Sequence, residues 1–199
     1  TICVQSGTTT ELNLADYFRK NGLEFKPVVF EGFEESIAAF FKGRCDAYTT
    51  DASALAVIRT ANAPDPEQYE LLREVISKEP LAPAVRQDDW DWFTIARWTL
   101  AALIQAEEFG IRQDNAADLK KKSKDPEILR FLGATPGFGK SLGLSEAWAM
   151  NVVQAVGNYG EIYERTLGHG SALKLDRSFN DGLNLLWTDG GLHYSPAFR

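Results

Sequence analysis

The sequence predicts an α/β protein in which a parallel-sheet lobe is followed by an α-rich C-terminal segment. Two observations support this prediction. From residue 1 to residue 78, strand-like and helix-like segments alternate, which is the pattern of a parallel sheet covered by helices. From about residue 90 onward, the apolar residues instead recur almost everywhere at helical spacing. The change of character near residue 78 predicts two parts, residues 1–78 and residues 79–199.

The elements of the first part follow from local patterns of apolar and turn-forming residues. Strands are predicted at residues 2–6, 26–30, 45–50 and 69–76. Helices are predicted at residues 8–20, 33–41 and 52–60, each with apolar residues on one face.

After a turn at residues 77–80 and a strand at residues 81–86, the second part is predicted to be nearly all helical. Helices are expected at residues 90–109, around the lysines of residues 120–124, at residues 148–162 and in a last turn at residues 183–187. Residues 133–143 form a glycine-rich connection. All five tryptophans lie in this part, at spacings that favour packing in a core.

Composition argues against several classes of function. The net charge of −7 and the pI of about 4.9 disfavour nucleic acid and anionic membranes as partners, because both would repel the chain. No segment approaches the ~20 apolar residues of a membrane helix. The chain has no initiator methionine and starts inside a predicted strand, so we expect a piece of a longer protein.

The sharpest local motif is SGTTTE, between the first predicted strand and the first predicted helix. Thr8 and Glu11 have the spacing of a capping box, in which each side chain bonds a backbone N–H of the other residue. Gly7 permits the tight turn. The free N–H groups and partial positive charge of a helix start also suit an anionic or polar ligand, so a helix cap and a ligand site are both open. The motif lacks the lysine and the glycine spacing of a P-loop.

A second motif, CDAYTTDAS, ends a predicted strand in two hydroxyls and a carboxylate. Ligands of open parallel sheets bind at the carboxyl ends of the strands, so Asp51 is predicted to face the turn that carries Thr8, Thr9 and Thr10. A carboxylate there suits a substrate ammonium group. The alternative is an N-cap for the helix that follows. Asp46, at the start of the strand, is predicted to be structural.

Cys3 and Cys45 lie near the starts of strands that we expect to be neighbours. A disulfide is geometrically credible, and a pair of reduced core thiols is the alternative. Neither His169 nor His193 has a carboxylate or a second histidine at metal-ligand spacing. The sequence also contains no nucleophile elbow. We therefore predict no metal, no cofactor and no catalytic residue.

Five blocks in this order resemble the type II periplasmic binding-protein fold, and above all the receptors of general L-amino-acid ABC importers. The blocks are ICVQSGTTTELNLADYF, GRCDAYTTDASALA, ISKEPLAPAVRQDDWDWF, VGNYGEIYERTLG and GLNLLWTDGGLHYSPAFR, and the likeness covers essentially the whole chain. It implies two lobes with a free L-amino acid held between them. It also implies that the turn containing Gly7, Thr8, Thr9 and Thr10 contacts this ligand, and that Asp51 binds its α-ammonium group.

The resemblance further implies how the two parts divide the fold. Residues 1–78 correspond to the second ligand-binding lobe, incomplete at its start. Residues 79–199 correspond to the return crossover, the C-terminal part of the first lobe and a helical tail. The groups that clamp the ligand carboxylate in this family have no counterpart here, so the chain alone is expected to bind amino acids weakly. Uncovered apolar surface predicts self-association. A periplasmic location and the membrane permease of an ABC importer as partner are also implied.

Two other functions stay open. An enzyme on the same fold, such as a dehydratase of a cyclic carboxylic acid, needs a general acid or base in the cleft. Only Asp51 and Glu11 lie near the predicted rim. A truncated sensor or interaction module is the second alternative, and the start of the chain favours it more than any motif does.

Overall fold

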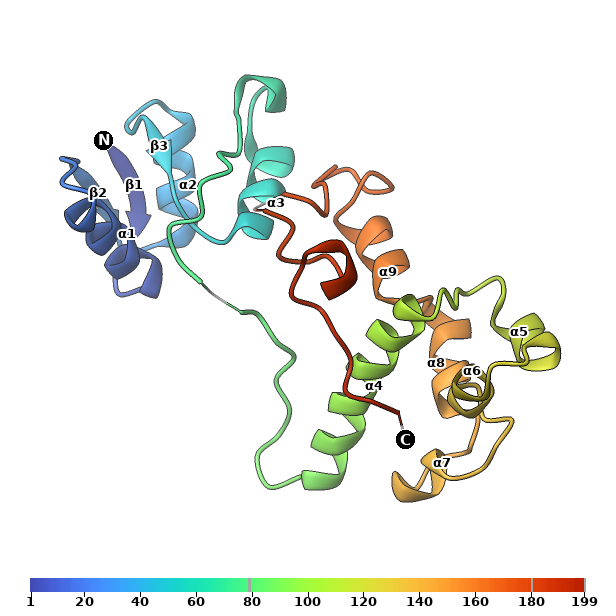
Figure 1. The fold of residues 1–199 in the computed structure, drawn as a ribbon. Helices are drawn as coiled ribbons and strands as arrows, with labels where there is room; N and C mark the ends of the chain where they lie inside the picture. The colour runs from blue at the N-terminus through green and yellow to red at the C-terminus, as the bar shows by residue number, and fades with distance from the viewer. Residues whose placement is uncertain (79, 180, 199) are drawn as a thin grey trace. The chain divides into compact units, whose positions relative to one another are not determined.

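The structure is a computed structural model that describes residues 1–78, 80–179 and 181–198 (Figure 1). The chain divides into two compact units, Thr1–Leu81 (unit 1) and Ala82–Arg199 (unit 2), which we describe separately. The division falls near the boundary predicted at residue 78, whereas the assignment of the parts to lobes of a binding protein stays a prediction. Glu79, in the predicted turn at residues 77–80, lies outside the described residues.

Unit 1 alternates strands and helices. In chain order its elements are β1 (Ile2–Gln5), α1 (Thr9–Lys20), β2 (Pro27–Phe30), α2 (Phe33–Phe41), β3 (Ala47–Tyr48), α3 (Ala52–Asn62) and the 3-10 turn η1 (Pro66–Gln68). The strands form a parallel sheet in the order β2-β1-β3, with β1 in the centre (Figure 1). The parallel α/β lobe predicted from the sequence is thereby confirmed.

Strand β3 is shorter than the strand predicted at residues 45–50. Only Ala47 and Tyr48 pair with β1. The N–H groups of Asp46 and Ala47 both donate to the carbonyl of Thr1, at 3.0 and 3.2 Å, so the chain joins the sheet only at residue 47. Because this pairing is so short, the position of β3 depends on additional contacts.

A disulfide between Cys3 and Cys45 is one of these contacts. The two Cα atoms are 5.6 Å apart, and both cysteines are buried beside Phe30 and Ala39. The disulfide confirms one of the two states that the sequence left open and rules out the pair of reduced thiols. Because Cys3 lies in the central strand, the disulfide ties the segment before β3 to the middle of the sheet.

Unit 2 is helical, as predicted. Its elements are α4 (Trp90–Glu108), α5 (Ala116–Lys122), α6 (Pro126–Phe131), α7 (Phe138–Ser141), α8 (Trp148–Val156), α9 (Tyr159–Thr166) and the 3-10 turn η2 (Trp187–Asp189). Helix α4 packs against α8 and α9, and α5 packs against α6 and α8. The core between them is apolar and includes the fully buried side chains of Ile111, Phe131, Leu132 and Val153.

The strands predicted at residues 69–76 and 81–86 are wrong, because the described residues of both ranges form no strand. A strand needs a neighbour whose backbone groups pair with its own, which a local pattern of apolar residues does not supply. Tyr69 instead packs its ring against Phe40 and Phe41, with ring centroids 5.7 and 4.9 Å apart.

The single helix predicted at residues 148–162 is also wrong, because the structure has two helices there. Gly157 ends α8 with a φ of 78° and a ψ of −176°, a backbone conformation that favours glycine over residues with a side chain. Asn158 then caps α9 in a capping box with Glu161, whose carboxylate accepts the Asn158 N–H at 2.9 Å. The residue that ends α8 therefore directly precedes the residue that caps α9.

Three smaller predictions for unit 2 need correction. The last helical turn is η2 rather than residues 183–187, and the connection at residues 133–143 contains the short helix α7. Of the tryptophans expected in a core, Trp90, Trp92 and Trp187 are 72%, 54% and 61% exposed. The first turns of α4 extend past its buried face, which begins at Ala101. Within the described residues, no helix combines the length and the apolar character needed to cross a bilayer.

Candidate functional site

The predicted site residues lie where β1 and β3 end in unit 1. We call this region the carboxyl edge; it consists of residues 6–10 after β1 and residues 49–51 after β3. The strands are parallel neighbours with Cys3 opposite Tyr48, so continuing the register sets Ser6 level with Asp51. The crossings from β1 to β2 and from β2 to β3 run in opposite directions across the sheet, and ligands bind where such an order reverses. The fold thus brings the two predicted motifs to the same edge.

The turn before α1 is held by its own side chains. Thr8 is the N-cap residue, and its Oγ1 accepts the Glu11 N–H at 3.2 Å and donates to the Gln5 carbonyl at 2.8 Å. The Glu11 carboxylate accepts the N–H of Gly7 at 2.9 Å. The capping interaction predicted for Thr8 is therefore present, but Glu11 reaches one residue further back than a capping box requires. Gly7, with a φ of 68°, makes the turn that allows this reach.

The backbone N–H groups of Thr9 and Thr10 remain open at the start of α1. The first N–H groups of any helix lack partners within the helix. Those of Gly7 and Glu11 are bound to side chains, whereas the described residues supply no acceptor for those of Thr9 and Thr10. Thr9 is exposed and Thr10 is half-buried, so an anionic group from solution can reach both. The helix dipole favours such a group.

Asp51 occupies the N-cap position of α3 without capping it. Its carbonyl accepts the Leu55 N–H at 2.8 Å, so the helix begins regularly, but its side chain accepts no capping hydrogen bond. The side chain is half-buried, and its carboxylate has no partner among the described residues. The capping alternative is therefore not realised. The carboxylate is available to a ligand at the carboxyl edge. Asp46 instead accepts a 2.6 Å hydrogen bond from the Thr1 hydroxyl, which agrees with its predicted structural role.

Two residues that the sequence analysis did not single out, Ser36 and Tyr48, contact each other at the end of β3, next to this edge. Ser36 of α2 is fully buried, and its Oγ lies 3.1 Å from the hydroxyl of Tyr48, the last residue of β3. Burial raises the pKa of the Tyr48 hydroxyl. Ser36 directly follows Glu34 and Glu35 in the sequence, so no local pattern marked it as buried, and only the packed fold shows this contact.

The histidines of unit 2 make ordinary contacts. His169 lies 3.1 Å from the carboxylate of Asp176, and both side chains are exposed. The ring of His193 packs against that of Tyr159, with centroids 4.6 Å apart. Burial, followed by the charge of Arg177, lowers the pKa of His193. In the part of the chain that the structure describes, no three His, Cys, Asp or Glu side chains gather at metal-binding distance.

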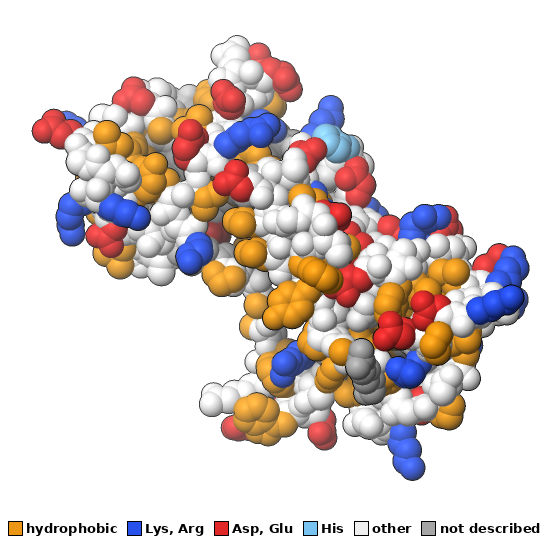
Figure 2. Space-filling view, viewed as in Figure 1, with side chains coloured by type: hydrophobic (Ala, Val, Ile, Leu, Met, Phe, Trp, Pro, Cys, Tyr) orange, Lys and Arg blue, Asp and Glu red, His pale blue; other side chains and the backbone are white. Residues whose placement is uncertain are grey.

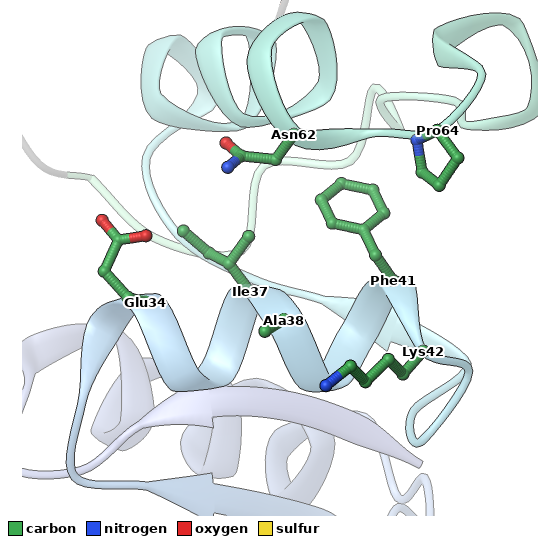
Figure 3. A pocket seen from close by; sticks show the side chains of 7 residues that line it. All are labelled: Glu34, Ile37, Ala38, Phe41, Lys42, Asn62 and Pro64. Carbon is green, nitrogen blue, oxygen red and sulfur yellow. The ribbon is translucent and has the colours of Figure 1, made fainter.

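Two surface pockets lie away from the carboxyl edge. In unit 1, a pocket of about 340 Å³ lies between α2 and the segment that ends α3, with Ile37 and Phe41 directed towards Asn62 and Pro64 (Figure 3). Glu34, Ala38 and Lys42 complete its lining. In unit 2, a pocket of about 450 Å³ is lined by Gln105, Glu108, Trp187, Tyr194, Ser195 and Ala197. Neither is lined by a predicted ligand-binding residue.

No family model matches the chain, but curated proteins align with all of it. It is 55% identical over 200 residues to the general L-amino acid-binding periplasmic protein AapJ of Rhizobium johnstonii. It is 46% identical over 199 residues to the glutamate/glutamine/aspartate/asparagine-binding protein BztA of Rhodobacter capsulatus. A putative amino-acid ABC transporter-binding protein of Escherichia coli K12, YhdW, is 44% identical. The chain spans 57% of the length of each of these relatives.

A solved structure agrees with these sequence matches. An ABC transporter/periplasmic binding protein from Brucella ovis with glutathione bound superimposes with a TM-score of 0.88 at 52% identity. The match covers 100% of this chain and 60% of that chain. This chain is a homologue of periplasmic amino-acid-binding proteins of ABC transporters.

The homology confirms the fold class and the periplasmic location that the resemblance implied. The proteins named above are transport-binding proteins rather than enzymes. The roles of individual residues at the carboxyl edge, the lobe assignment of residues 1–78 and 79–199, and the self-association stay predictions.

Proposed function

We propose that this chain contributes the ammonium-binding half of an amino-acid site in the substrate-binding component of an ABC uptake system. The ligand is a free L-amino acid taken up from the periplasm, and the partner is the membrane permease of the importer. The observation that carries the proposal is the pairing of two open polar groups of opposite character at one sheet edge. They are the carboxylate of Asp51 and the free N–H groups of Thr9 and Thr10.

The chemistry of an α-amino acid fits this pair. Its ammonium group would donate charge-assisted hydrogen bonds to Asp51, which are stronger than those between neutral groups. Its carboxylate would also accept from the N–H groups at the start of α1, where the helix dipole adds a favourable potential, although the groups that clamp this carboxylate in the family have no counterpart in this chain. Thr8 and Gly7 would contribute by holding the turn, because their polar groups are engaged with Glu11 and Gln5.

The named relatives support recognition of the α-amino-acid group rather than of one side chain. AapJ is named for L-amino acids in general and BztA for four of them, while the protein from Brucella ovis holds glutathione. Glutathione also carries one α-amino-acid group, at its γ-glutamyl end. A site made of Asp51 and the start of α1 would bind this shared group and leave the side chain to other contacts.

Calorimetric titration with a panel of L-amino acids tests the proposal. The titrated proteins are this chain and a chimera in which its 199 residues replace the matching part of AapJ. We expect tighter binding by the chimera than by the chain alone. Asp51→Asn should weaken binding by about 100-fold or more, because the ammonium group then loses its charged partner.

Asp46→Asn is the matched control. It removes the same charge from the other end of β3, where the carboxylate is 82% exposed, and should leave affinity unchanged. Absence of binding by the wild-type chimera, or equal losses in the two variants, contradicts the proposal.

Self-association is the remaining partner prediction. Apolar side chains reach the surface on the face shown in Figure 2. The most exposed large apolar residues of α4 are Trp90, Trp92 and Phe93, of which Trp90 and Phe93 contact each other at 5.9 Å between ring centroids. Such a cluster favours association with another apolar surface.

A further inference from the structure

Contacts other than sheet hydrogen bonds hold both ends of strand β3 in place. At its start, the disulfide of Cys45 holds the chain to β1. At its end, the hydroxyl of Tyr48 contacts Ser36 of α2. The disulfide lies on the far side of β3 from the carboxyl edge, whereas Tyr48 stands three positions before Asp51. The contact between Tyr48 and Ser36 therefore lies closer to the proposed ligand site than the disulfide does.

The hydrogen bonds around Ser36 form a directed chain. Its Oγ donates to the carbonyl of Phe33 at 2.6 Å, which leaves the oxygen free to accept from the Tyr48 hydroxyl at 3.1 Å. The Tyr48 ring also packs 5.9 Å from that of Phe40. Ser36 and Phe40 both belong to α2, a helix that packs on all three strands. The end of β3 is thus held against helix α2.

Little else in the sheet holds the chain between Tyr48 and Asp51. The bond from the Thr49 N–H to the Cys3 carbonyl, at 3.3 Å, is the last that the described residues show between β1 and this segment. Asp51 then starts α3 without a capping bond from its side chain. The position of Asp51 is therefore set from two sides, by α3, whose first turn it begins, and by the end of β3, where Tyr48 is held.

We propose that Tyr48 and Ser36 are positioning residues that set the affinity of the site for the α-ammonium group by orienting Asp51. The inference rests on the proposed function, because it assigns a support to the same site. Neither residue touches the ligand, and both act through the carboxylate of Asp51. A site must hold its charged groups in place before the ligand arrives, since any freedom they lose on binding lowers affinity.

Tyr48→Phe is the primary variant, measured by calorimetry in the chimera. It removes one hydroxyl and keeps the ring against Phe40, and Ser36 keeps its bond to the Phe33 carbonyl, so no buried donor is left unpaired. We expect the affinity for an L-amino acid to fall roughly fivefold to tenfold. Ser36→Ala should cause a similar loss. The double variant should lose no more than either single variant, because the two side chains act as one unit.

The ligand supplies a readout that a general loss of structure would not move. The deamino analogue of the same amino acid, with a hydrogen atom in place of the ammonium group, keeps the carboxylate and has no α-substituent that can bind Asp51. Tyr48→Phe should change the affinity for this analogue by less than about twofold, since the variant acts only through Asp51. Tyr69→Phe is the matched control, because the ring of Tyr69, like that of Tyr48, packs on Phe40 of α2, and it should leave both affinities unchanged.

Each other outcome decides between the inference and the proposed function. If Asp51→Asn abolishes binding while Tyr48→Phe has no effect, the inference is wrong and the proposed function stands. Equal losses for the amino acid and its deamino analogue, or an equal loss in Tyr69→Phe, also overturn the inference. If the wild-type chimera binds no amino acid, both are wrong.

Discussion

The two units differ in how their polar groups are engaged. In unit 2, the guanidinium of Arg177 forms a two-point ion pair with Glu107, with the longer of the two contacts at 3.0 Å. Its Nε donates to the Asn184 carbonyl at 2.8 Å, and its plane lies over the rings of Tyr159 and Tyr163. Arg177 thereby joins the end of α4, helix α9 and the C-terminal segment. The N–H donors of the Arg177 guanidinium thus bind acceptors within unit 2.

At the carboxyl edge of unit 1, by contrast, polar groups are left unpaired within the described residues. The N–H groups of Thr9 and Thr10 and the carboxylate of Asp51 have no partner in the described residues. Unpaired polar groups lower stability where they are buried, but Thr9 is exposed and Thr10 and Asp51 are only half-buried, so these groups cost less stability than unpaired groups in the core would. The comparison teaches that Arg177 of unit 2 binds other groups of its own unit, whereas the carboxyl edge of unit 1 leaves groups of opposite character unpaired, and the proposed ligand site rests on these groups.

The tryptophans make the comparison measurable. All five lie at or beyond residue 90 and hence in unit 2. Tryptophan fluorescence therefore reports on unfolding of unit 2, while far-UV circular dichroism reports on both units. A change that acts on one unit should separate the two signals.

Removal of the disulfide should have the largest effect on stability, and it should fall on unit 1. For a sequence separation of 42 residues, the chain-entropy relation gives a stabilisation of about 4 kcal/mol. The Cys3→Ala/Cys45→Ala variant should lose the circular dichroism of unit 1 at a lower denaturant concentration. The tryptophan transition should stay where it is. A shift of the tryptophan transition by the same amount would contradict the separate stabilisation of the two units.

Arg177→Ala should have the next largest effect, confined to unit 2. It leaves the carboxylate of Glu107, a side chain only 16% exposed, without its cation, at a cost of about 3 kcal/mol. The tryptophan transition should move to lower denaturant. Arg112→Ala is the control, because Arg112 pairs with Asp114 on the surface, where both side chains are more than half exposed. A surface pair of this kind contributes less than about 1 kcal/mol.

The smallest predicted effect concerns pH. Hydrogen bonds from Ser178, followed by His169, lower the pKa of Asp176 from its ordinary value of 3.8 to about 2. Because the folded pKa is the lower one, this carboxylate stabilises unit 2 above pH 3.8, and the contribution is lost as the pH falls towards 2. Asp176→Asn should flatten the acid dependence of the tryptophan transition in that window. His169→Ala should produce a smaller change of the same sign, and an unchanged profile in both variants would contradict the assignment.

Local pattern was sufficient to predict most elements of unit 1. Helix α2 follows from the spacing of Phe33, Ile37 and Phe40, and the parallel order follows from the alternation of strands and helices. The strands predicted at residues 69–76 and 81–86 failed because pairing is a tertiary property that no local pattern contains. The break between α8 and α9 was readable in principle, since a glycine precedes an Asn-x-x-Glu helix start.

The candidate site was predictable in part for the same reason. Thr8 and Asp51 were found because each follows a strand and precedes a helix, which is a local signature. The reach of Glu11 to Gly7 depends on the exact geometry of the turn. The contact between Ser36 and Tyr48 joins a helix to a strand 12 residues later, and only the packed fold shows it.

The proposed site requires that the unpaired groups at the carboxyl edge of unit 1 bind the amino acid. The most direct measurement is an NMR titration of the ¹⁵N-labelled chimera that follows the amides of Thr9 and Thr10, with the buried amides of Ile111 and Leu132 in unit 2 as references. On addition of a binding L-amino acid, we predict that the Thr9 and Thr10 amides shift most and that Asp51→Asn removes these shifts. Binding that leaves the Thr9 and Thr10 amides unmoved while shifting those of unit 2 would contradict the account.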